Sequence, residues 1–148
     1  SNNSNVVPLN QWSHVAVSIN QGVASLFVNG QLIPATWTGS FQAVNSSTTF
    51  RIGNFEGASF FNNGIIDEAR IWNIGLSQQD IENNRFKNIS STTTGLIGYW
   101  DFNQGVDAGA NTGITTLVDR SGNGYGGVIT NINLSGTTSN FVSSTGST

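Results

Sequence analysis

Two acidic residues, Asp67 and Glu68, stand side by side within an apolar stretch that has the composition of a β-strand. A glycoside hydrolase needs two carboxylates that face one cleft, roughly 5 to 9.5 Å apart. Neighbouring strand residues point to opposite faces, so this pair does not meet that need. His14, the only histidine, has no cysteine and no well-placed serine and acid for a catalytic triad. We therefore predict a protein that is not an enzyme.

The same residues have structural interpretations. We interpret His14 as a half-buried strand residue that is hydrogen-bonded across a hairpin. Glu68 and Arg70, two residues apart, would share a strand face and form an ion pair, either with each other or with a neighbouring strand. We favour a partly buried pair that fixes the strand register over contact with a ligand. Asp67, on the opposite face, would either cap a loop or bind a metal.

Oxygen-bearing side chains gather in the predicted loops after residue 100. Ca²⁺ takes roughly six to eight oxygen ligands, which loops supply well. The candidate ligands are Asp101, Asn103, Asp107 and Asp119. Asp101 and Asn103 are spaced like the start of an EF-hand, but the glycine and glutamate that complete that loop are missing. Because Asp, Asn and Gly also form ordinary turns, two interpretations stay open: a bound Ca²⁺ ion, or turns alone.

Aromatic residues in polar surroundings suggest a sugar site, because the apolar faces of sugars stack on exposed rings while amides bind their hydroxyls. The predicted carbohydrate-binding residues are Trp37, Phe60, Phe61, Asn62 and Tyr125. For Trp37, packing against a neighbouring element is an equal alternative. Trp12, Trp72 and Trp100 fall within strand patterns and are predicted to lie in the core.

Short strands and tight turns must position these residues. Alternation with period two predicts a strand over residues 11–20 and another over 23–30, which ends in the hairpin signal Asn29-Gly30. Further strands are predicted over residues 31–37, 48–53, 64–73 and 95–102, with two short runs within 115–130 and a last one within 134–148. One helix is predicted within residues 76–86, with Ser77 and Asp80 as a capping box and with Ile81 and Phe86 on its inner face.

Composition agrees with this pattern of elements. The 148 residues include 18 glycines, and only 9% are charged. The net charge is −3 and the five basic residues are scattered, so nucleic acid is not an expected partner. No apolar run is long enough to span a bilayer, so membrane insertion is not expected. The absence of methionine suggests a piece of a longer precursor. We predict an all-β fold, an antiparallel β-sandwich (jelly roll) with one short helix.

Four segments suggest a family. They are WSHVAVSINQGVASLFVNGQLI, RIGNFEGASFFNNGIIDEARIWNIGLSQQDI, GLIGYWDFNQG and DRSGNGYGGVI. In wording and spacing they resemble the laminin G-like, concanavalin A-like jelly-roll family, in the form found in bacterial surface proteins. The order is permuted, with closing-half segments first, and the middle of such a domain is missing. This order fits a fragment of two tandem domains, a permuted or shortened sandwich, or half a sandwich that another chain completes.

We favour one compact unit, because an unpaired strand at residues 95–102 would expose an apolar edge. The predicted organisation is an N-terminal lead-in over residues 1–10, a laminin G-like β-sandwich over 11–142, whole or incomplete, and a disordered tail over 143–148. The resemblance implies a lectin-like module of a secreted or cell-surface bacterial adhesin, which binds a glycan or glycoprotein with or without calcium. The alternative is a structural spacer or protein-interaction module that contacts neighbouring domains or chains of a surface assembly.

Overall fold

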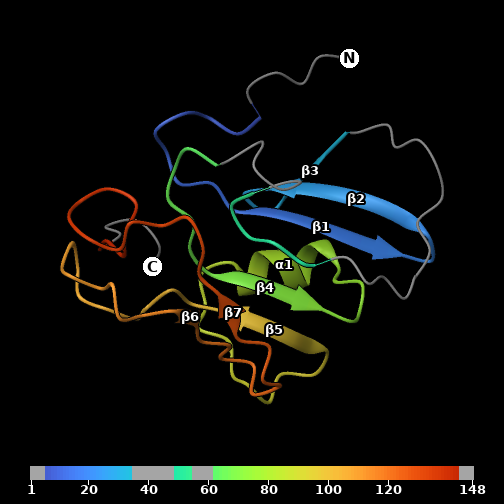
Figure 1. The fold of residues 1–148 in the computed structure, drawn as a ribbon. Coiled ribbons are helices and arrows are strands. Elements are labelled where there is room, and N and C mark those ends of the chain that lie inside the picture. The colour runs from blue at the N-terminus through green and yellow to red at the C-terminus, as the bar shows by residue number, and fades with distance from the viewer. Residues whose placement is uncertain (1–5, 35–48, 55–61, 144–148) are drawn as a thin grey trace.

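The computed structural model describes residues 6–34, 49–54 and 62–143 (Figure 1). Within this part of the chain, the strands form one three-stranded and two two-stranded sheets, and all the strand pairs are antiparallel. The elements are β1 (Val15–Asn20), β2 (Val23–Val28), β3 (Gln31–Ile33), β4 (Ala69–Trp72), α1 (Gln78–Asn84), β5 (Leu96–Trp100), β6 (Thr116–Leu117) and β7 (Gly127–Val128). The predicted all-β class with a single short helix is confirmed.

Two glycine turns build the first sheet, β1–β2–β3. Gln21-Gly22 joins β1 to β2 and Asn29-Gly30 joins β2 to β3, each with positive φ at both residues. Positive φ at both central residues gives the twist that a two-residue hairpin needs. Asn29 also extends the β1–β2 pairing, because its N–H donates to the carbonyl of His14 (2.8 Å) and its side-chain oxygen accepts from the N–H of His14 (2.9 Å). The predicted bonding of His14 across the hairpin is thus confirmed, although the strand begins at Val15 rather than at residue 11.

The two faces of this sheet differ in a way that the alternation alone does not predict. The apolar residues of β1, Val15, Val17 and Ile19, are about half exposed. Ser18, on the other face, is buried, and its hydroxyl donates to the carbonyl of Leu76 just before α1 (2.7 Å). Along β1, the face that contacts the segment before α1 is therefore the more buried one. The face that carries the apolar residues of β1 is open to solvent.

The second sheet pairs β4 with β5, and α1 lies between this sheet and β1–β2–β3 (Figure 1). Leu96, Tyr99 and Trp100 are at most 6% exposed, so the predicted core role of this strand is confirmed. The predicted strand over residues 64–73 is shorter, because Glu68 takes a positive φ of 56° and β4 begins after it. The strand predicted over residues 48–53 is wrong for the described residues 49–53, which form no strand; the next residue, Asn54, makes a single bridge.

Helix α1 follows its sequence signals closely at its beginning. The Ser77 hydroxyl accepts from the N–H of Asp80 (3.1 Å), and the Asp80 carboxylate accepts from the N–H of Ser77 (3.1 Å), which completes the predicted capping box. Ile81 is buried, as predicted. Phe86 is 60% exposed, so its predicted inward position is wrong. The reason is that α1 ends at Asn84, so helical spacing no longer sets the direction of Phe86.

Removing the cap tests this assignment. We expect Ser77→Ala to lower the free energy of unfolding by about 1 kcal/mol, because the N–H of Asp80 loses its acceptor. Urea unfolding followed by circular dichroism measures the change. Gln79→Ala, an exposed substitution in the same helical turn, is the control and should change stability by less than about 0.5 kcal/mol. Equal effects of the two substitutions would contradict the capping role.

The last part of the described chain consists mainly of loops and turns. The two short strands predicted within residues 115–130 are present as β6 and β7. The strand predicted within 134–148 is reduced, in its described residues, to a bridge between Ala110 and Ser135.

Two of the tryptophans predicted to lie in the core are less buried than expected. Trp12 is 40% exposed, so its predicted core position is wrong, whereas Trp72 is half-buried. Residues 144–148 of the predicted tail lie outside the described residues, and the domain boundaries stay predictions.

Candidate aromatic binding site

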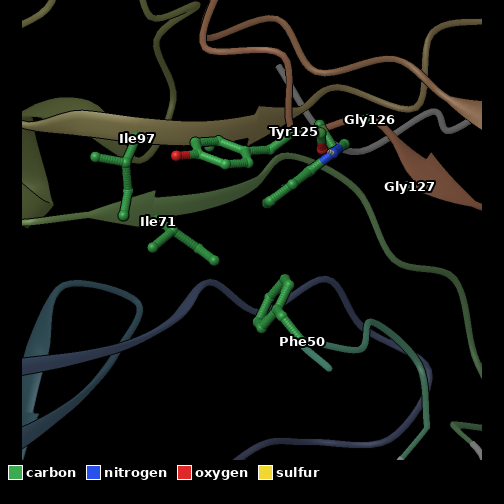
Figure 2. A pocket seen from close by; sticks show the side chains of 8 residues that line it. Phe50, Ile71, Ile97, Tyr125, Gly126 and Gly127 are labelled. Carbon is green, nitrogen blue, oxygen red and sulfur yellow. Dashed lines mark hydrogen bonds between the residues drawn. The ribbon is translucent and has the colours of Figure 1, made fainter. Parts of the chain in front are cut away.

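The described residues form a cavity of about 340 Å³ on the β4–β5 sheet, at the turn that leads into β7 (Figure 2). Ligand sites in proteins commonly have volumes from about 300 Å³ upward. The lining comes from three parts of the chain: the segment before Gly53, the two strands, and the glycine-rich turn. The lining residues are Phe50, Ile71, Ile97, Gly98, Trp100, Tyr125, Gly126 and Gly127.

Three aromatic rings dominate this site, which we call the aromatic cavity. Phe50 stacks on Trp100 with ring centroids 5.7 Å apart and planes inclined by 25°. Trp100 is only 5% exposed, and its indole N–H donates to the carbonyl of Tyr125 (3.1 Å). Phe50 and Tyr125 are 59% and 62% exposed. The cavity therefore combines a fixed inner ring with two outer rings that a ligand can reach.

The sheet register explains why the inner ring lies where it does. Ile71 is paired with Gly98, and Trp100 lies two residues further along β5 on the same face. Gly98 has no side chain, and a Cβ atom built there would lie 2.6 Å from Cη2 of Trp100. The indole therefore occupies the space above Gly98 and forms part of the cavity wall.

This contact gives a prediction for Gly98→Ala. The added methyl group must push the Trp100 ring away, and we expect a loss of about 1–3 kcal/mol in the free energy of unfolding, as in other overpacked cores. Near-UV circular dichroism should change with it, because the environment of Trp100 changes. Gly113→Ala is the matched control, since nothing lies within 4 Å of its Cβ position. A Gly98→Ala protein as stable as this control would overturn the contact.

The carboxylate of Asp119 holds the turn that carries Tyr125. One oxygen accepts from the N–H groups of Tyr99 (3.0 Å) and Ser121 (2.8 Å), and the other accepts from the Ser121 hydroxyl (2.8 Å) and the N–H of Tyr125 (2.9 Å). Burial by itself would raise the pKa of Asp119, but these hydrogen bonds together hold the pKa below its usual range. The turn is thereby tied to the β5 edge, and Arg120 adds an N–H bond to the carbonyl of Tyr99 (2.6 Å).

The charged groups of this sheet lie on its other face. Arg70 is paired with Tyr99 there, and it forms an ion pair with Glu68, as predicted. The Tyr99 hydroxyl donates to the Glu68 carboxylate (2.8 Å), and the Arg70 guanidinium lies 5.1 Å from the Tyr99 ring centre. Arg70 also donates to the carbonyls of Asn84 (2.8 Å) and Lys87 (2.7 Å) at the end of α1. Burial, and then the bond to Glu68, raise the pKa of Tyr99 to about 12.

The other residues considered for catalysis lie outside the aromatic cavity. Asp67 accepts the N–H of Glu68 (2.9 Å), which is a local cap of the kind proposed for it. His14 is half-buried, as predicted, and its Nδ1 atom is buried without a partner among the described residues. Burial, followed by the positive charges of Arg70 and Arg85, lowers the pKa of His14. These positions fit structural roles.

Of the predicted sugar-binding residues, Tyr125 lines the aromatic cavity. Asn62 is exposed, and its N–H donates to the carbonyl of Gly53 (2.8 Å), close in sequence to Phe50. Trp37, Phe60 and Phe61 lie outside the described residues. The sequence interpretation missed Phe50, Ile71, Ile97 and Trp100 as cavity residues. No short-range signal marks them, because the segments that carry Phe50, Ile71 and Trp100 are distant in sequence and meet only through the fold.

Three of the four predicted metal ligands have other partners for their carboxylates in the described structure, and the fourth, Asn103, takes part only through its N–H. Asp101 pairs with Arg120 (3.0 Å) and accepts the N–H of Asn103 (3.3 Å). Asp107 accepts the N–H of Ser143 (2.8 Å), and Asp119 holds the Tyr125 turn. Residues 6–34, 49–54 and 62–143 contain no group of three or more His, Cys, Asp or Glu residues arranged to hold a metal. Calcium binding stays a prediction.

Comparisons with known proteins give one match. A laminin G domain model, described as concanavalin A-like lectin/glucanases superfamily, matches residues 1–82, more than half of the chain. No curated protein and no solved structure gives a significant match. In the part of the chain that the structure describes, none of the helical segments has the length and hydrophobicity to cross a membrane.

Proposed function

Because the chain belongs to the concanavalin A-like lectin/glucanase superfamily, we propose that it is a non-catalytic module that binds a carbohydrate or the glycan of a glycoprotein. The observation behind this proposal is the aromatic cavity, with the exposed rings of Phe50 and Tyr125 beside the buried ring of Trp100. Aromatic rings stack on the apolar faces of sugars and leave the sugar hydroxyls free for polar partners.

A non-catalytic role is supported by the partners of the acidic residues. A glycosidase keeps one carboxyl group free to protonate the leaving oxygen and a second one near the sugar ring. Here Glu68 is held by Arg70 and Tyr99 on the sheet face opposite Trp100, and Asp119 has four hydrogen-bond donors around it. Both carboxylates are committed to holding the fold.

Binding can be tested with a glycan array and then by fluorescence titration, because Trp100 lies in the cavity wall. We expect Tyr125→Ala and Phe50→Ala each to weaken binding about five- to tenfold, the effect of losing one stacked ring. Phe86→Ala is the matched control, since Phe86 is equally exposed and is not among the residues that line the cavity. Loss of binding in the control alone, or an array without any signal, would overturn the proposal.

Calcium assistance and an extracellular location belong to the same proposal. Laminin G-like domains are typically extracellular, which supports a secreted or cell-surface setting for this chain. The titration run with millimolar Ca²⁺ and with a chelator tests the calcium part, and a Ca²⁺ ion that binds the native state must also raise the melting temperature. No change in either measurement would contradict calcium binding at Asp101, Asn103, Asp107 and Asp119.

A second candidate function, a structural or protein-interaction module, is favoured by the open side of β1. This edge strand exposes Val15, Val17 and Ile19 on one face. Apolar edge strands are suited to contact with another sheet or chain. An array without signal, together with self-association or partner binding that Val17→Lys abolishes, would favour this function over sugar binding.

A further inference from the structure

We propose that His14 makes the contact between α1 and the β1–β2–β3 sheet sensitive to acid, so that protonation of its ring releases α1 from the turn between β2 and β3. The proposal concerns a conformational change and does not depend on sugar binding. It rests on three observations: the ring lies where the hairpin meets the helix, one of its nitrogens is buried without an acceptor, and two arginines act on it.

The Asn29-Gly30 turn connects His14 to α1. The backbone of His14 is bonded to Asn29 by two hydrogen bonds (2.8 and 2.9 Å). From the helix, the Gln78 amide donates to the carbonyl of Gly30 (3.0 Å). The Glu82 carboxylate lies so close to Gly30 that a Cβ atom built there would overlap it. His14 is thus held at the place where α1 meets the end of the hairpin.

The charged groups that act on the ring are Arg70 from β4, and Arg85 and Glu82 from α1. Glu82 is the anion among them, and both of its carboxylate oxygens accept from the Arg85 guanidinium (2.8 and 3.0 Å). Burial, and then the charges of Arg70 and Arg85, lower the pKa of His14, whereas Glu82 opposes this with a smaller effect. The stabilisation that comes from the neutral ring is therefore complete above the unfolded pKa of about 6.5, and it is lost as the pH falls below that value.

The Nδ1 atom of His14 determines what protonation does to the structure. In the neutral ring the proton can reside on Nε2, which leaves Nδ1 as a bare acceptor. In the imidazolium both nitrogens are donors, so Nδ1 gains an N–H bond that is buried without an acceptor among the described residues. Such a donor is costly, and movement of α1 away from the turn would open it to water. A helix of seven residues is not stable by itself in water, so α1 should unfold when it is released.

The test uses the unmodified chain, because His14 is its only histidine and its imidazole NMR signal is therefore unambiguous. We expect this signal to titrate with a midpoint below 6.5, the usual value. Between pH 7.5 and pH 5, the hydrogen-exchange protection factors of the N–H groups of Ile81 and Arg85, which are bonded within α1, should fall at least about fivefold, the smallest effect of a buried donor without an acceptor. The N–H of Asn111, which is bonded to Leu134 in the last part of the described chain, should keep its protection.

Variants connect this change to the ring. His14→Phe keeps an aromatic ring that cannot take up a proton, so the fall in protection should disappear. Arg85→Gln removes one of the two cations and should raise the midpoint of His14. Arg120→Gln is the matched control, because Arg120 is not among the charges that act on the ring, and it should leave the midpoint unchanged.

Three results would overturn the proposal: a midpoint at or above 6.5, protection of α1 that does not fall with pH, or a fall that persists in His14→Phe. An equal midpoint in Arg85→Gln and Arg120→Gln would overturn it as well. If His14→Phe does not fold, the measurements on the unmodified chain and on the two arginine variants decide the question.

Discussion

Replacing Arg70 by methionine is expected to lower the free energy of unfolding by about 3 kcal/mol or more. The Arg70 side chain is only 9% exposed, and it neutralises Glu68, whose side chain is 21% exposed. Removing one partner of a buried ion pair leaves the other charge without compensation, which typically costs about 3–5 kcal/mol. The carbonyls of Asn84 and Lys87 also lose a donor, at a helix end whose last turn has no basic residue of its own.

Chemical unfolding monitored by circular dichroism measures this loss. Arg120→Met is the matched control, because the Arg120 side chain is 43% exposed, so water can replace it beside its partner Asp101, whose own side chain is 16% exposed. Exposed ion pairs contribute about 0–1 kcal/mol, so this substitution should have a small effect. If the two substitutions cost the same, Arg70 does not hold the sheet to the helix as described.

A double substitution separates the effect of the uncompensated Glu68 charge from the effect of losing the packing of the Arg70 side chain. Glu68→Gln removes the charge that Arg70→Met leaves uncompensated, while its amide can still bond the Tyr99 hydroxyl. The double variant should therefore be less destabilised than the sum of the two single variants, by about 1 kcal/mol or more. Strict additivity would mean that the two side chains are not energetically coupled.

Local signals in this sequence predict local structure well. The Asn29-Gly30 turn, the Ser77–Asp80 capping box and the ion pair of Glu68 with Arg70 each depend on residues a few positions apart, and all three are present. A prediction that extended a local pattern past the end of its helix was wrong. Phe86 follows the helical spacing of Ile81, but the helix ends before it.

The aromatic cavity shows what a single sequence does not contain. Tyr125 was recognisable because a large aromatic residue in a glycine-rich turn is exposed. The sequence around Phe50 and Trp100 has the pattern of ordinary strands. Their stacking depends on which segment the fold places over β5, and a single sequence does not contain this information. The acidic loop residues were ambiguous for a related reason, because a carboxylate in a turn can bind either a metal or backbone N–H groups.

Asp119 uses its carboxylate to bind backbone N–H groups. Its replacement by alanine is expected to lower the free energy of unfolding by about 3 kcal/mol. Hydrogen bonds to a charged group contribute roughly 1.5–3 kcal/mol each, and partial replacement by water recovers some of this at an accessible site. The N–H of Tyr99, on a buried residue of β5, is left without its acceptor. Because the same carboxylate holds the N–H of Tyr125, the substitution should also weaken the sugar binding that we propose for the aromatic cavity.

The dependence of the free energy of unfolding on pH, at acidic pH, gives an independent measurement of the stabilisation by Asp119. The pKa of Asp119 is lowered in the folded protein, so the unfolded chain binds more protons as the pH falls. The stabilisation is complete above the unfolded pKa, which is about 3.9, and it is lost as the pH falls through the lower folded pKa. In Asp119→Asn this part of the dependence should disappear, so the difference from the unmodified protein should be large at pH 7 and shrink toward pH 2.

Asp107→Asn is the matched control for this experiment. Asp107 is exposed and its oxygen accepts one N–H, from Ser143, which also lowers its pKa. Its replacement should change stability by less than about 1 kcal/mol, since one exposed hydrogen bond contributes little. A cost for Asp119→Asn no greater than this, or a difference that does not depend on pH, would mean that the carboxylate does not hold the Tyr125 turn. In that case the geometry of the aromatic cavity would need another support, because among the described residues the N–H of Tyr125 donates to Asp119 alone.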